Sequence, residues 1–288
     1  MIRKAVFPAA GFGTRFLPAT KASPKEMLPL VDVPLIQHGV AEAKAAGMSD
    51  MIIVTGRGKN VIEDHFDMAF ELEALLEKKG SDDLLEIVRG VTDQADFFYV
   101  RQNRPLGLGH AVLRAMALVG EESFAVVLSD DVIDARVPVL KQMIGVSETH
   151  QAAVVLAVQK VPEEDVSKYG IIEGKEIAPG VYEVFDMIEK PSSGEAPSNL
   201  AIIGRYILPP SIFPALIATR PGAGGEIQLT DAIRSLIGKN RVVGCEFEGT
   251  RYDAGTKLGF LMANVAFAMK DPDLASGLKA FIQKEKFA

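Results

Sequence analysis

The sequence predicts an α/β fold with a central mixed, mostly parallel sheet that is flanked by helices. Two observations lead to this prediction. Strand-like runs alternate with helical patterns along the first half of the chain, which is typical of crossover connections. These strand-like runs are almost continuously apolar, as expected for strands that are covered on both faces. With 288 residues, no internal repeat and no long linker, we expect a single domain spanning 1–288.

The predicted elements follow one another with short connections. The strands of the first half are expected at 3–9, 50–56, 96–102 and 123–130. The helices between them are expected at 34–47, 69–80 and 109–120. The second half is less regular and predicts a mixed extension of the sheet, with strands at 151–159, 169–174, 181–191, 198–210 and 242–249. A helix is expected at 225–238, and two helices at the C-terminus.

Charge and composition exclude several classes of protein. Lys and Arg number 31 against 38 Asp and Glu, a net charge of −7, which disfavours nonspecific binding to nucleic acid. Cys245 is the single cysteine, so no intrachain disulfide or cysteine-rich zinc site is expected. The apolar runs are too short to span a membrane, and the N-terminus leads directly into a predicted strand. We therefore expect a cytoplasmic protein with no membrane partner.

A glycine-rich loop, AAGFGTRFLPATKASPKEMLP (9–29), follows the first predicted strand. Loops at the carboxyl ends of strands in open α/β sheets collect ligands, and their backbone N–H groups can bind phosphate. Phe16 stands where a dinucleotide-binding motif needs its third glycine, and no P-loop pattern surrounds it. A Gly-x-Gly pair by itself indicates only a tight turn. Two cations, Arg15 and Lys25, lie on the same proline-containing loop, and they favour a polyphosphate ligand over a simple turn.

The loop resembles the signature of bacterial UTP:glucose-1-phosphate uridylyltransferases, a branch of the sugar-nucleotide pyrophosphorylases. Further matching blocks follow in the same order, among them VTGRGK (54–59), VRQNRPLGLGHAV (100–112), LSDD (128–131), EKP (189–191), GGEIQLTDAI (224–233) and RYDAGTKLGF (251–260). The resemblance implies a Rossmann-like nucleotidyltransferase fold. It also implies transfer of a uridylyl group from UTP to glucose 1-phosphate, giving UDP-glucose and pyrophosphate by a single in-line displacement assisted by Mg²⁺.

The resemblance also assigns roles to residues. Arg15, Lys25 and Lys190 are expected to bind the reacting phosphates and form the catalytic set. The nucleotide is expected to contact Ala9, Ala10, Gly11, Gly13, Gln102, Gly107 and Asp130. In particular, the amide of Gln102 offers uracil both a donor and an acceptor. The sugar phosphate is expected to contact Gly170, Glu189, Lys190, Asn199 and Ala201.

Two aspartates are the expected ligands of Mg²⁺, which binds one or two carboxylates together with phosphate oxygens and water. By analogy with the family these are Asp130 and Asp253, with Asp131 as an alternative to Asp130. The four histidines lack the spacing of metal ligands. Glu226 and Asp231 could act at the site or cap a helix, and the sequence leaves both interpretations open.

Several alternatives remain at this point. A related enzyme could use dTTP or another sugar phosphate, and a non-catalytic nucleotide-sugar-binding protein could keep the same loops. An NAD-dependent oxidoreductase is disfavoured by the missing third glycine. We expect residues 1–135 to bind mainly the nucleotide, 136–270 mainly the sugar phosphate, and 271–288 to form a C-terminal helix. The expected assembly is a homo-oligomer, either a dimer or a tetramer.

Overall fold

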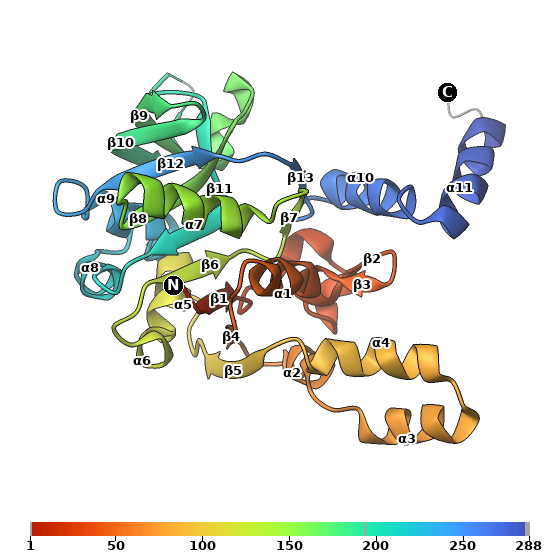
Figure 1. The fold of residues 1–288 in the computed structure, drawn as a ribbon. Helices are drawn as coiled ribbons and strands as arrows, with labels where there is room; N and C mark the ends of the chain where they lie inside the picture. Colours follow the sequence, from red (N-terminus) through yellow and green to blue (C-terminus); the bar gives the residue numbers. More distant parts are fainter. Residues whose placement is uncertain (1, 193, 286–288) are drawn as a thin grey trace.

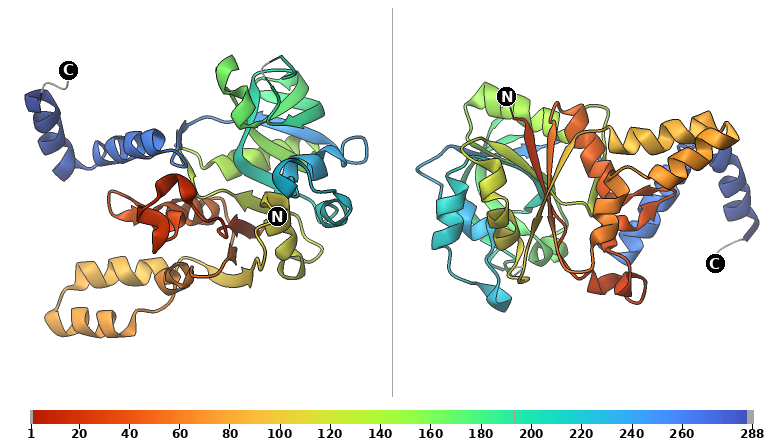
Figure 2. Two further views of the ribbon diagram at one scale, coloured as in Figure 1. Left: turned by 180° about the vertical axis from the view of Figure 1, so that it is seen from behind. Right: turned by 90° about the horizontal axis from the view of Figure 1, so that it is seen from below.

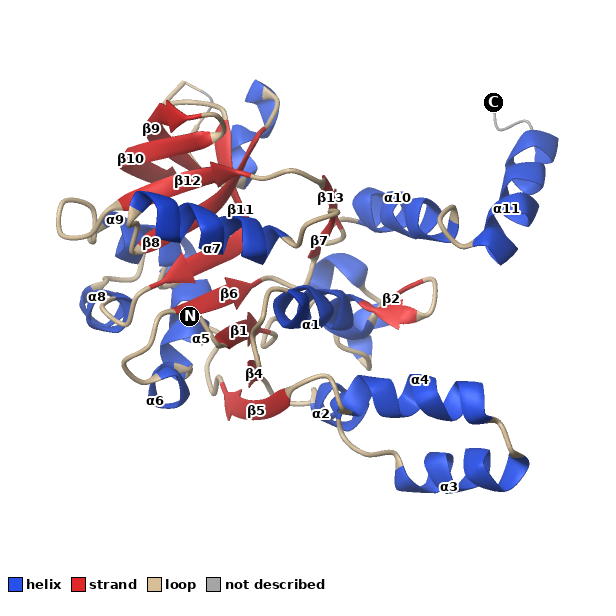
Figure 3. Ribbon diagram, viewed as in Figure 1, coloured by secondary structure: helices blue, strands red, loops and turns tan. Residues whose placement is uncertain are grey.

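The computed structural model describes residues 2–192 and 194–285, and it contains a nine-stranded sheet with helices on both faces (Figures 1 and 3). In spatial order the strands are β5 (Asp96–Arg101), β4 (Asp50–Thr55), β1 (Lys4–Pro8), β6 (Phe124–Val127), β11 (Leu200–Leu208), β8 (Val154–Lys160), β12 (Val242–Glu246), β10 (Val181–Glu189) and β9 (Gly170–Ala178).

The sheet is mixed, with most strands pointing in one direction. β5, β4, β1 and β6 are parallel neighbours, and β8 and β12 form another parallel pair. β10 and β11 run in the opposite direction, and each is antiparallel to its neighbours in the sheet. This arrangement confirms the fold class expected from the alternating, continuously apolar strands. It also places the carboxyl ends of the parallel strands β5, β4, β1 and β6 at one edge of the sheet.

Two layers of helices cover the sheet, as the view from below shows (Figure 2). One face packs against α1 (Leu35–Ala45), α2 (Asn60–Phe66) and α7 (Val139–His150). The other face packs against α5 (Leu108–Arg114), α8 (Ile212–Ala218) and α9 (Leu229–Arg234). Every residue of β4, β6 and β11 is buried, because these central strands contact both layers.

Two helical segments extend from this body (Figures 1 and 2). One is a hairpin of α3 (Phe70–Lys79) and α4 (Asp82–Thr92), and the other is an arm of α10 (Lys257–Ala268) and α11 (Pro272–Glu285). The last three residues of the expected segment 271–288 lie outside the described residues. No helix in the described part of the chain has the length and apolar character needed to span a membrane.

Two small antiparallel sheets lie beside the main one. The first joins β2 (Pro29–Leu30) to β3 (Val33–Pro34), at the end of the glycine-rich loop. The second joins β7 (Asp131–Asp134) to β13 (Thr250–Asp253), and it places Asp131 directly opposite Asp253. The strand expected over 123–130 is therefore shorter: β6 ends at Val127, and a turn leads into β7.

Two predicted helices differ from those observed. The helix expected at 109–120 is divided into α5 and α6 (Met116–Val119) at Ala115. Of the helix expected at 225–238, only α9 forms. Gly224 and Gly225 adopt φ angles of 71° and 75°, which interrupt a helix. The segment that follows pairs instead with the loop after β5: Ile227 donates its N–H to Leu106 and accepts from the N–H of Gly109.

A buried ion pair connects α1 to the centre of the sheet. Arg205 of β11 is 1% exposed, and its guanidinium donates to Oε2 of Glu42 in α1, with Nη2 at 2.8 Å. Nη1 of Arg205 donates to the carbonyl of Leu128 at 2.9 Å, directly after β6. A buried guanidinium must be paired, so this contact fixes α1 relative to the turn between β6 and β7.

We predict that Glu42→Ala lowers the free energy of unfolding by about 3 to 5 kcal/mol, because the charge of Arg205 is left buried and unpaired. Urea denaturation measures this change. Glu77→Ala is the matched control, because Glu77 pairs with Arg89 at the surface and is 53% exposed. Its loss should cost about 1 kcal/mol or less. Equal losses of unfolding free energy in the two variants would show that the buried ion pair contributes no more to stability than the surface pair.

Candidate active site

Two cavities meet at the carboxyl ends of the central strands. The first, which we call the loop cavity, is lined chiefly by the glycine-rich loop and the loop after β5. The second, the strand cavity, is lined chiefly by β9, β10, β11 and β13 with their adjoining turns. Both are lined by Leu108, Leu128, Asp130 and Glu226. Asp130 therefore faces the point where the two cavities join.

The glycine-rich loop forms one wall of the loop cavity. Ala10, Gly11 and Phe12 line this cavity. Ala9 is buried and donates its N–H to the carbonyl of Val54 in β4, which fixes the start of the loop to the sheet. Gly13 adopts a φ of 64° and accepts a hydrogen bond from Thr20. Ala9 and Gly13 thus determine the shape of the loop, while Ala10 and Gly11 are available to a ligand.

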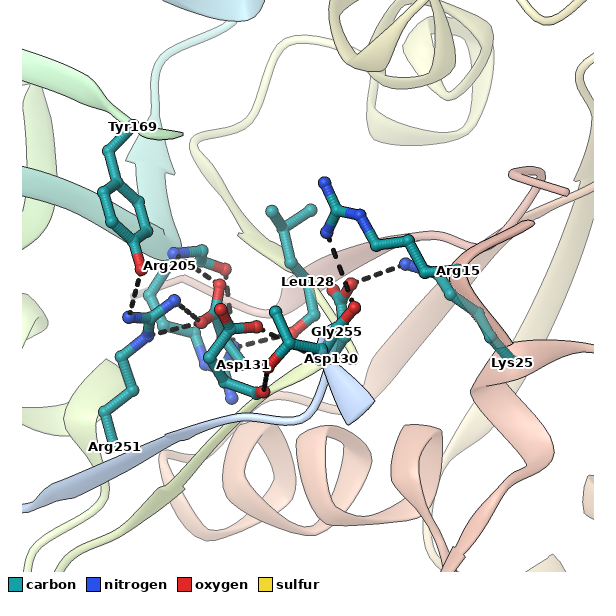
Figure 4. Close-up of polar contacts among 12 residues, drawn as sticks. Arg15, Lys25, Leu128, Asp130, Asp131, Tyr169, Arg205, Arg251 and Gly255 are labelled. Carbon is teal, nitrogen blue, oxygen red and sulfur yellow. Dashed lines mark hydrogen bonds and ion pairs between the residues drawn. The ribbon is translucent and has the colours of Figure 1, made fainter. Parts of the chain in front are cut away.

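Lys25 and Asp130 form a short ion pair where the cavities meet, with Nζ 2.6 Å from Oδ2 (Figure 4). Burial favours the neutral form of the Asp130 carboxyl, but the Lys25 ammonium and its hydrogen bond outweigh burial and lower the pKa of Asp130. Burial likewise opposes the charge of Lys25, and Asp130 reverses the effect, so that the pKa of Lys25 is raised. Both groups remain charged at neutral pH.

The adjacent Asp131 has a different environment. Its Oδ2 accepts from the N–H of Gly204, and its Oδ1 pairs with Arg251 of β13. Arg251 also lies over the ring of Tyr169 and donates to its hydroxyl at 3.2 Å. Figure 4 shows Arg251 and Tyr169 on one side of the turn, and Arg15 and Lys25 on the other. Both carboxylate oxygens of Asp131 therefore bind protein groups.

The carboxylates of Asp253 and Asp130 lie close to each other at Gly255. A Cβ atom added to Gly255 would lie 2.8 Å from Oδ2 of Asp130 and 3.0 Å from Oδ1 of Asp253. Both oxygens have protein partners: Oδ2 of Asp130 pairs with Lys25, and Oδ1 of Asp253 accepts from the N–H of Gly255 at 3.0 Å. Both carboxylates also line the strand cavity, so a metal held there would share them with these partners and take its remaining ligands from phosphate and water. Among the described residues, no group of three His, Cys, Asp or Glu side chains could hold a metal ion. A metal at this site therefore requires ligands from a substrate.

Arg15 extends from the glycine-rich loop to the opposite wall. It lines the strand cavity, and its Nη1 donates to the carbonyl of Gly255 at 3.5 Å. The two loop cations expected from the sequence therefore lie on both sides of the junction. Lys25 contacts Asp130, and Arg15 contacts the turn that follows Asp253.

The strand cavity is lined by three of the residues expected to bind the sugar phosphate, Gly170, Glu189 and Lys190. Gly170 of β9 lies directly opposite Glu189 of β10, and both line the cavity. Thr230 donates to Oε2 of Glu189 at 2.6 Å, which fixes the orientation of the carboxylate. Lys190 follows with a φ of 47°, unusual for a residue with a side chain, and its Nζ lies 3.3 Å from Oε1 of Glu189.

Asn199 and Ala201 were also expected at the sugar, and the structure places neither at a cavity. Asn199 is exposed, and Ala201 is fully buried in the core on the side of α1 and α7. Side chains alternate between the faces of a strand, so Ile202, Gly204 and Tyr206 of β11 line the strand cavity instead. Ala201 therefore lies on the face of β11 opposite the strand cavity, and Asn199 lies just before this strand.

Gln102 lines the loop cavity, but its amide is partly used by the protein. Its Nε2 lies 3.1 Å from the carbonyl oxygen of Gly107 and 2.9 Å from Nδ1 of His110. The expectation that this amide offers a ligand both a donor and an acceptor must therefore be corrected. The acceptor, Oε1, is the part that remains for a ligand.

Gly107 and Gly109 have a packing role, which for Gly107 is additional to the expected contact with the nucleotide. Gly107 adopts a φ of 93°, and a Cβ atom there would lie 2.7 Å from Cβ of Glu226. A Cβ atom on Gly109 would lie 2.7 Å from the carbonyl oxygen of Ile227. The close approach of segment 226–228 therefore requires glycine at both positions.

The motif GEIQLTD contributes to both cavities. Glu226 lines both, whereas Asp231 lies in the first turn of α9 and lines neither. Burial, and then the charge of Glu189, raise the pKa of Asp231. Thr230, which the sequence did not suggest, is the residue of this motif that contacts Glu189.

A second ion pair, also not anticipated, joins Lys59 to Glu26, which lines the loop cavity. Nζ of Lys59 is 2.8 Å from Oε2 of Glu26, and the two side chains are 8% and 1% exposed. Burial raises the pKa of Glu26 against the opposing effect of Lys59. Lys59 ends the block VTGRGK, so the match of this block to the family was the available signal.

Comparisons with known proteins agree with this geometry. Residues 4–270 match the family model described as nucleotidyl transferase. The chain is 53% identical over 283 residues to a UTP–glucose-1-phosphate uridylyltransferase of Staphylococcus epidermidis, covering 98% of both chains. The fold is similar to that of a UDP-glucose pyrophosphorylase solved in complex with UDP-glucose, with a TM-score of 0.87, 47% identity and coverage of 94% of this chain and 100% of the other.

The fold is also similar to that of a UTP-bound UGPase from Acinetobacter baumannii, with a TM-score of 0.91 and 41% identity. This match covers 99% of this chain and 100% of the other. These matches extend over almost the whole chain and confirm the resemblance noted in the motif blocks. The chain therefore belongs to the nucleotidyl transferase family, in the branch of the UTP–glucose-1-phosphate uridylyltransferases.

Proposed function

We propose that the protein transfers the uridylyl group of UTP to glucose 1-phosphate in the presence of Mg²⁺, forming UDP-glucose and pyrophosphate. The observation that carries this proposal is the junction of the two cavities at Asp130, with cations on both sides of it. The loop cavity is assigned to UTP and the strand cavity to the sugar phosphate. This assignment is in line with the expected division of the chain near residue 135: the residues given for the loop cavity lie before it except Glu226, whereas the strand cavity takes residues from both parts.

The reaction requires two anions to approach each other. A phosphate oxygen of glucose 1-phosphate attacks the α-phosphorus of UTP, and the bond from this phosphorus to the bridging oxygen breaks. Pyrophosphate leaves with the bonding electrons. The protein supplies positioning and charge compensation, so neither a general base nor a covalent intermediate is needed.

Three cations are assigned to these phosphates. Lys25 and Arg15 bind the triphosphate of UTP at the junction, and the backbone N–H groups of Ala10 and Gly11 contribute further donors. Lys190 binds the phosphate of the sugar from the other side. Glu189, held by Thr230, accepts hydrogen bonds from the sugar hydroxyls.

Enzymes of the nucleotidyl transferase family generally use a divalent metal. Here Asp130 and Asp253 would hold Mg²⁺, which when bound neutralises charge on the phosphate oxygens. The placement of Asp131 supports Asp130 as the ligand, because both oxygens of Asp131 are occupied by Gly204 and Arg251. Asp131 then acts through the protein by fixing β7 against β13.

The arm formed by α10 and α11 supports the expected homo-oligomer, either a dimer or a tetramer. Leu258, Leu261 and Met262 of α10 are 69%, 61% and 57% exposed, and such a cluster is unusual on a monomer's surface. A second copy of the chain is the occupant that we infer for this face. The cytoplasmic location expected from the sequence stays a prediction.

An assay of pyrophosphate release tests the proposed function directly. The purified protein is incubated with Mg²⁺, UTP and glucose 1-phosphate, and UDP-glucose is identified by chromatography. Both products should appear, and omission of either substrate or addition of a chelator should abolish them. A panel of other nucleotides and sugar phosphates tests the alternatives, and a clear preference for dTTP would contradict the proposal.

We predict that Lys25→Ala lowers kcat by about 10²- to 10³-fold, the usual effect of removing one preorganised charged group. Steady-state rates of pyrophosphate release measure the change. Lys21→Ala is the matched control, because Lys21 lies exposed on the same loop and lines neither cavity. The assignment of Lys25 fails if its folded variant keeps the wild-type rate.

We further predict that Asp253→Asn raises the Mg²⁺ concentration needed for half-maximal activity and lowers kcat. Asp130→Asn should have the same effects, because the two carboxylates lie close to each other at Gly255 and line the same cavity. Mg²⁺ titrations of the rate measure both parameters. Asp134→Asn, at the other end of β7, should leave the titration unchanged. A wild-type Mg²⁺ dependence in both site variants would contradict this metal site.

Gln102→Leu is expected to lower kcat/KM for UTP and to narrow the preference for UTP over CTP. Uracil carries an N3–H donor, whereas the N3 of cytosine is an acceptor, so an acceptor on Gln102 favours uracil. The ratio of kcat/KM for the two nucleotides measures this preference. Gln94→Leu, in the loop before β5, serves as a surface control. An unchanged ratio in Gln102→Leu would show that another group reads the base.

A further inference from the structure

The amide of Gln102 has one orientation that fits its surroundings. Its nitrogen carries two hydrogens, and it has two partners, the carbonyl oxygen of Gly107 at 3.1 Å and Nδ1 of His110 at 2.9 Å. A carbonyl oxygen can only accept, so the nitrogen rather than the oxygen of the amide must face Gly107. The second hydrogen then points to His110. Oε1 of Gln102 makes no hydrogen bond with the described residues and remains for a ligand in the loop cavity.

This orientation determines the state of His110. Nδ1 can accept a hydrogen bond only when it carries a lone pair, so the ring proton is on Nε2 and the imidazole is neutral. Burial lowers the pKa of His110, the charge of Arg114 lowers it further, and a hydrogen bond to the backbone of Arg104 opposes both. The neutral ring is therefore the form present at physiological pH.

We propose that His110 is a positioning residue for base selection: it holds the amide of Gln102 with its oxygen toward the nucleobase and thereby favours uracil over cytosine. This inference rests on the proposed function and extends it to a residue that does not line the loop cavity itself. Gly107 provides the first acceptor for the amide and His110 the second. Without His110, one amide hydrogen has no protein partner, and the orientation that presents the acceptor is less strongly favoured.

The test compares two substitutions of equal size. In His110→Asn, Oδ1 is bonded to Cγ as Nδ1 is in histidine, so an acceptor remains near the same place. In His110→Leu a methyl group takes that position and no acceptor remains. For each variant, kcat/KM is measured with UTP and with CTP. Both nucleotides use the same phosphate site, so the ratio of the two values removes general losses of activity.

We expect His110→Leu to narrow the preference for UTP by about 3- to 10-fold, the effect of one neutral hydrogen bond. His110→Asn should stay within about 2-fold of the wild type because the acceptor is retained. In a Gln102→Leu background, His110→Leu should change the ratio no further, because the residue through which it acts is gone. Thermal unfolding of each variant confirms that the ratios are measured on folded protein.

Two results would overturn the inference. One is an unchanged ratio in His110→Leu, and the other is an equal narrowing by His110→Leu with and without Gln102. Calorimetric binding of UTP and CTP separates this failure from a failure of the proposed function. If the wild type binds UTP more tightly than CTP but releases no pyrophosphate, the proposed reaction is wrong. In that case the inference about His110 is tested by the ratio of the dissociation constants for UTP and CTP, measured by calorimetry in the same variants.

Discussion

The desolvation of two adjacent carboxylates, the partly buried Asp130 and the buried Asp131, is the constraint on which the rest of the site depends. Desolvation favours the neutral form of each carboxyl, and a cation beside each one opposes this effect. Asp130 is paired with Lys25 from the glycine-rich loop, and Asp131 with Arg251 from β13. Two segments distant in sequence are thereby held against the end of β6. The same turn is anchored below by Arg205, which binds the carbonyl of Leu128.

The two carboxylates have separate uses because their partners differ. Asp131 is surrounded by groups of the protein, so its charge stabilises the small sheet of β7 and β13. Asp130 faces the junction of the cavities and lies close to Asp253 at Gly255. Since Asp131 pairs directly opposite Asp253, the contact that satisfies one aspartate also positions the other, the second of the two proposed metal ligands. The pairing of β7 with β13 therefore stabilises the fold and also positions the residues proposed to act in the reaction.

Segment 226–228 has a comparable role on the other side of the junction. Its extended backbone pairs with Leu106 and Gly109 and determines the path of the loop that carries Gly107. Thr230, at the start of α9, reaches Glu189 in the strand cavity. The stretch 226–230 thus shapes the loop cavity through its backbone and orients the carboxylate of Glu189, the proposed sugar ligand, through a side chain. Close approach at Gly107 and Gly109 is the physical reason that glycine occurs there.

The sequence by itself determined the elements whose signal is local. Continuous apolar runs identified the buried strands, and the glycine-rich loop with Arg15 and Lys25 indicated a phosphate site at a strand end. The ordered motif blocks indicated the family. These features depend on neighbouring residues, so they can be recognised without knowledge of the fold.

The tertiary structure decided what depends on distant partners. It separated Asp130 from Asp131, since only the fold brings Lys25 to one and Arg251 to the other. It left residues 226–228 of the helix predicted at 225–238 outside α9, because Ile227 pairs with Leu106 and Gly109 instead. It turned Ala201 away from the cavity and assigned the amide hydrogens of Gln102 to Gly107 and His110. Strand face, ion-pair choice and amide orientation are set by contacts between segments, which the order of residues along the chain does not specify.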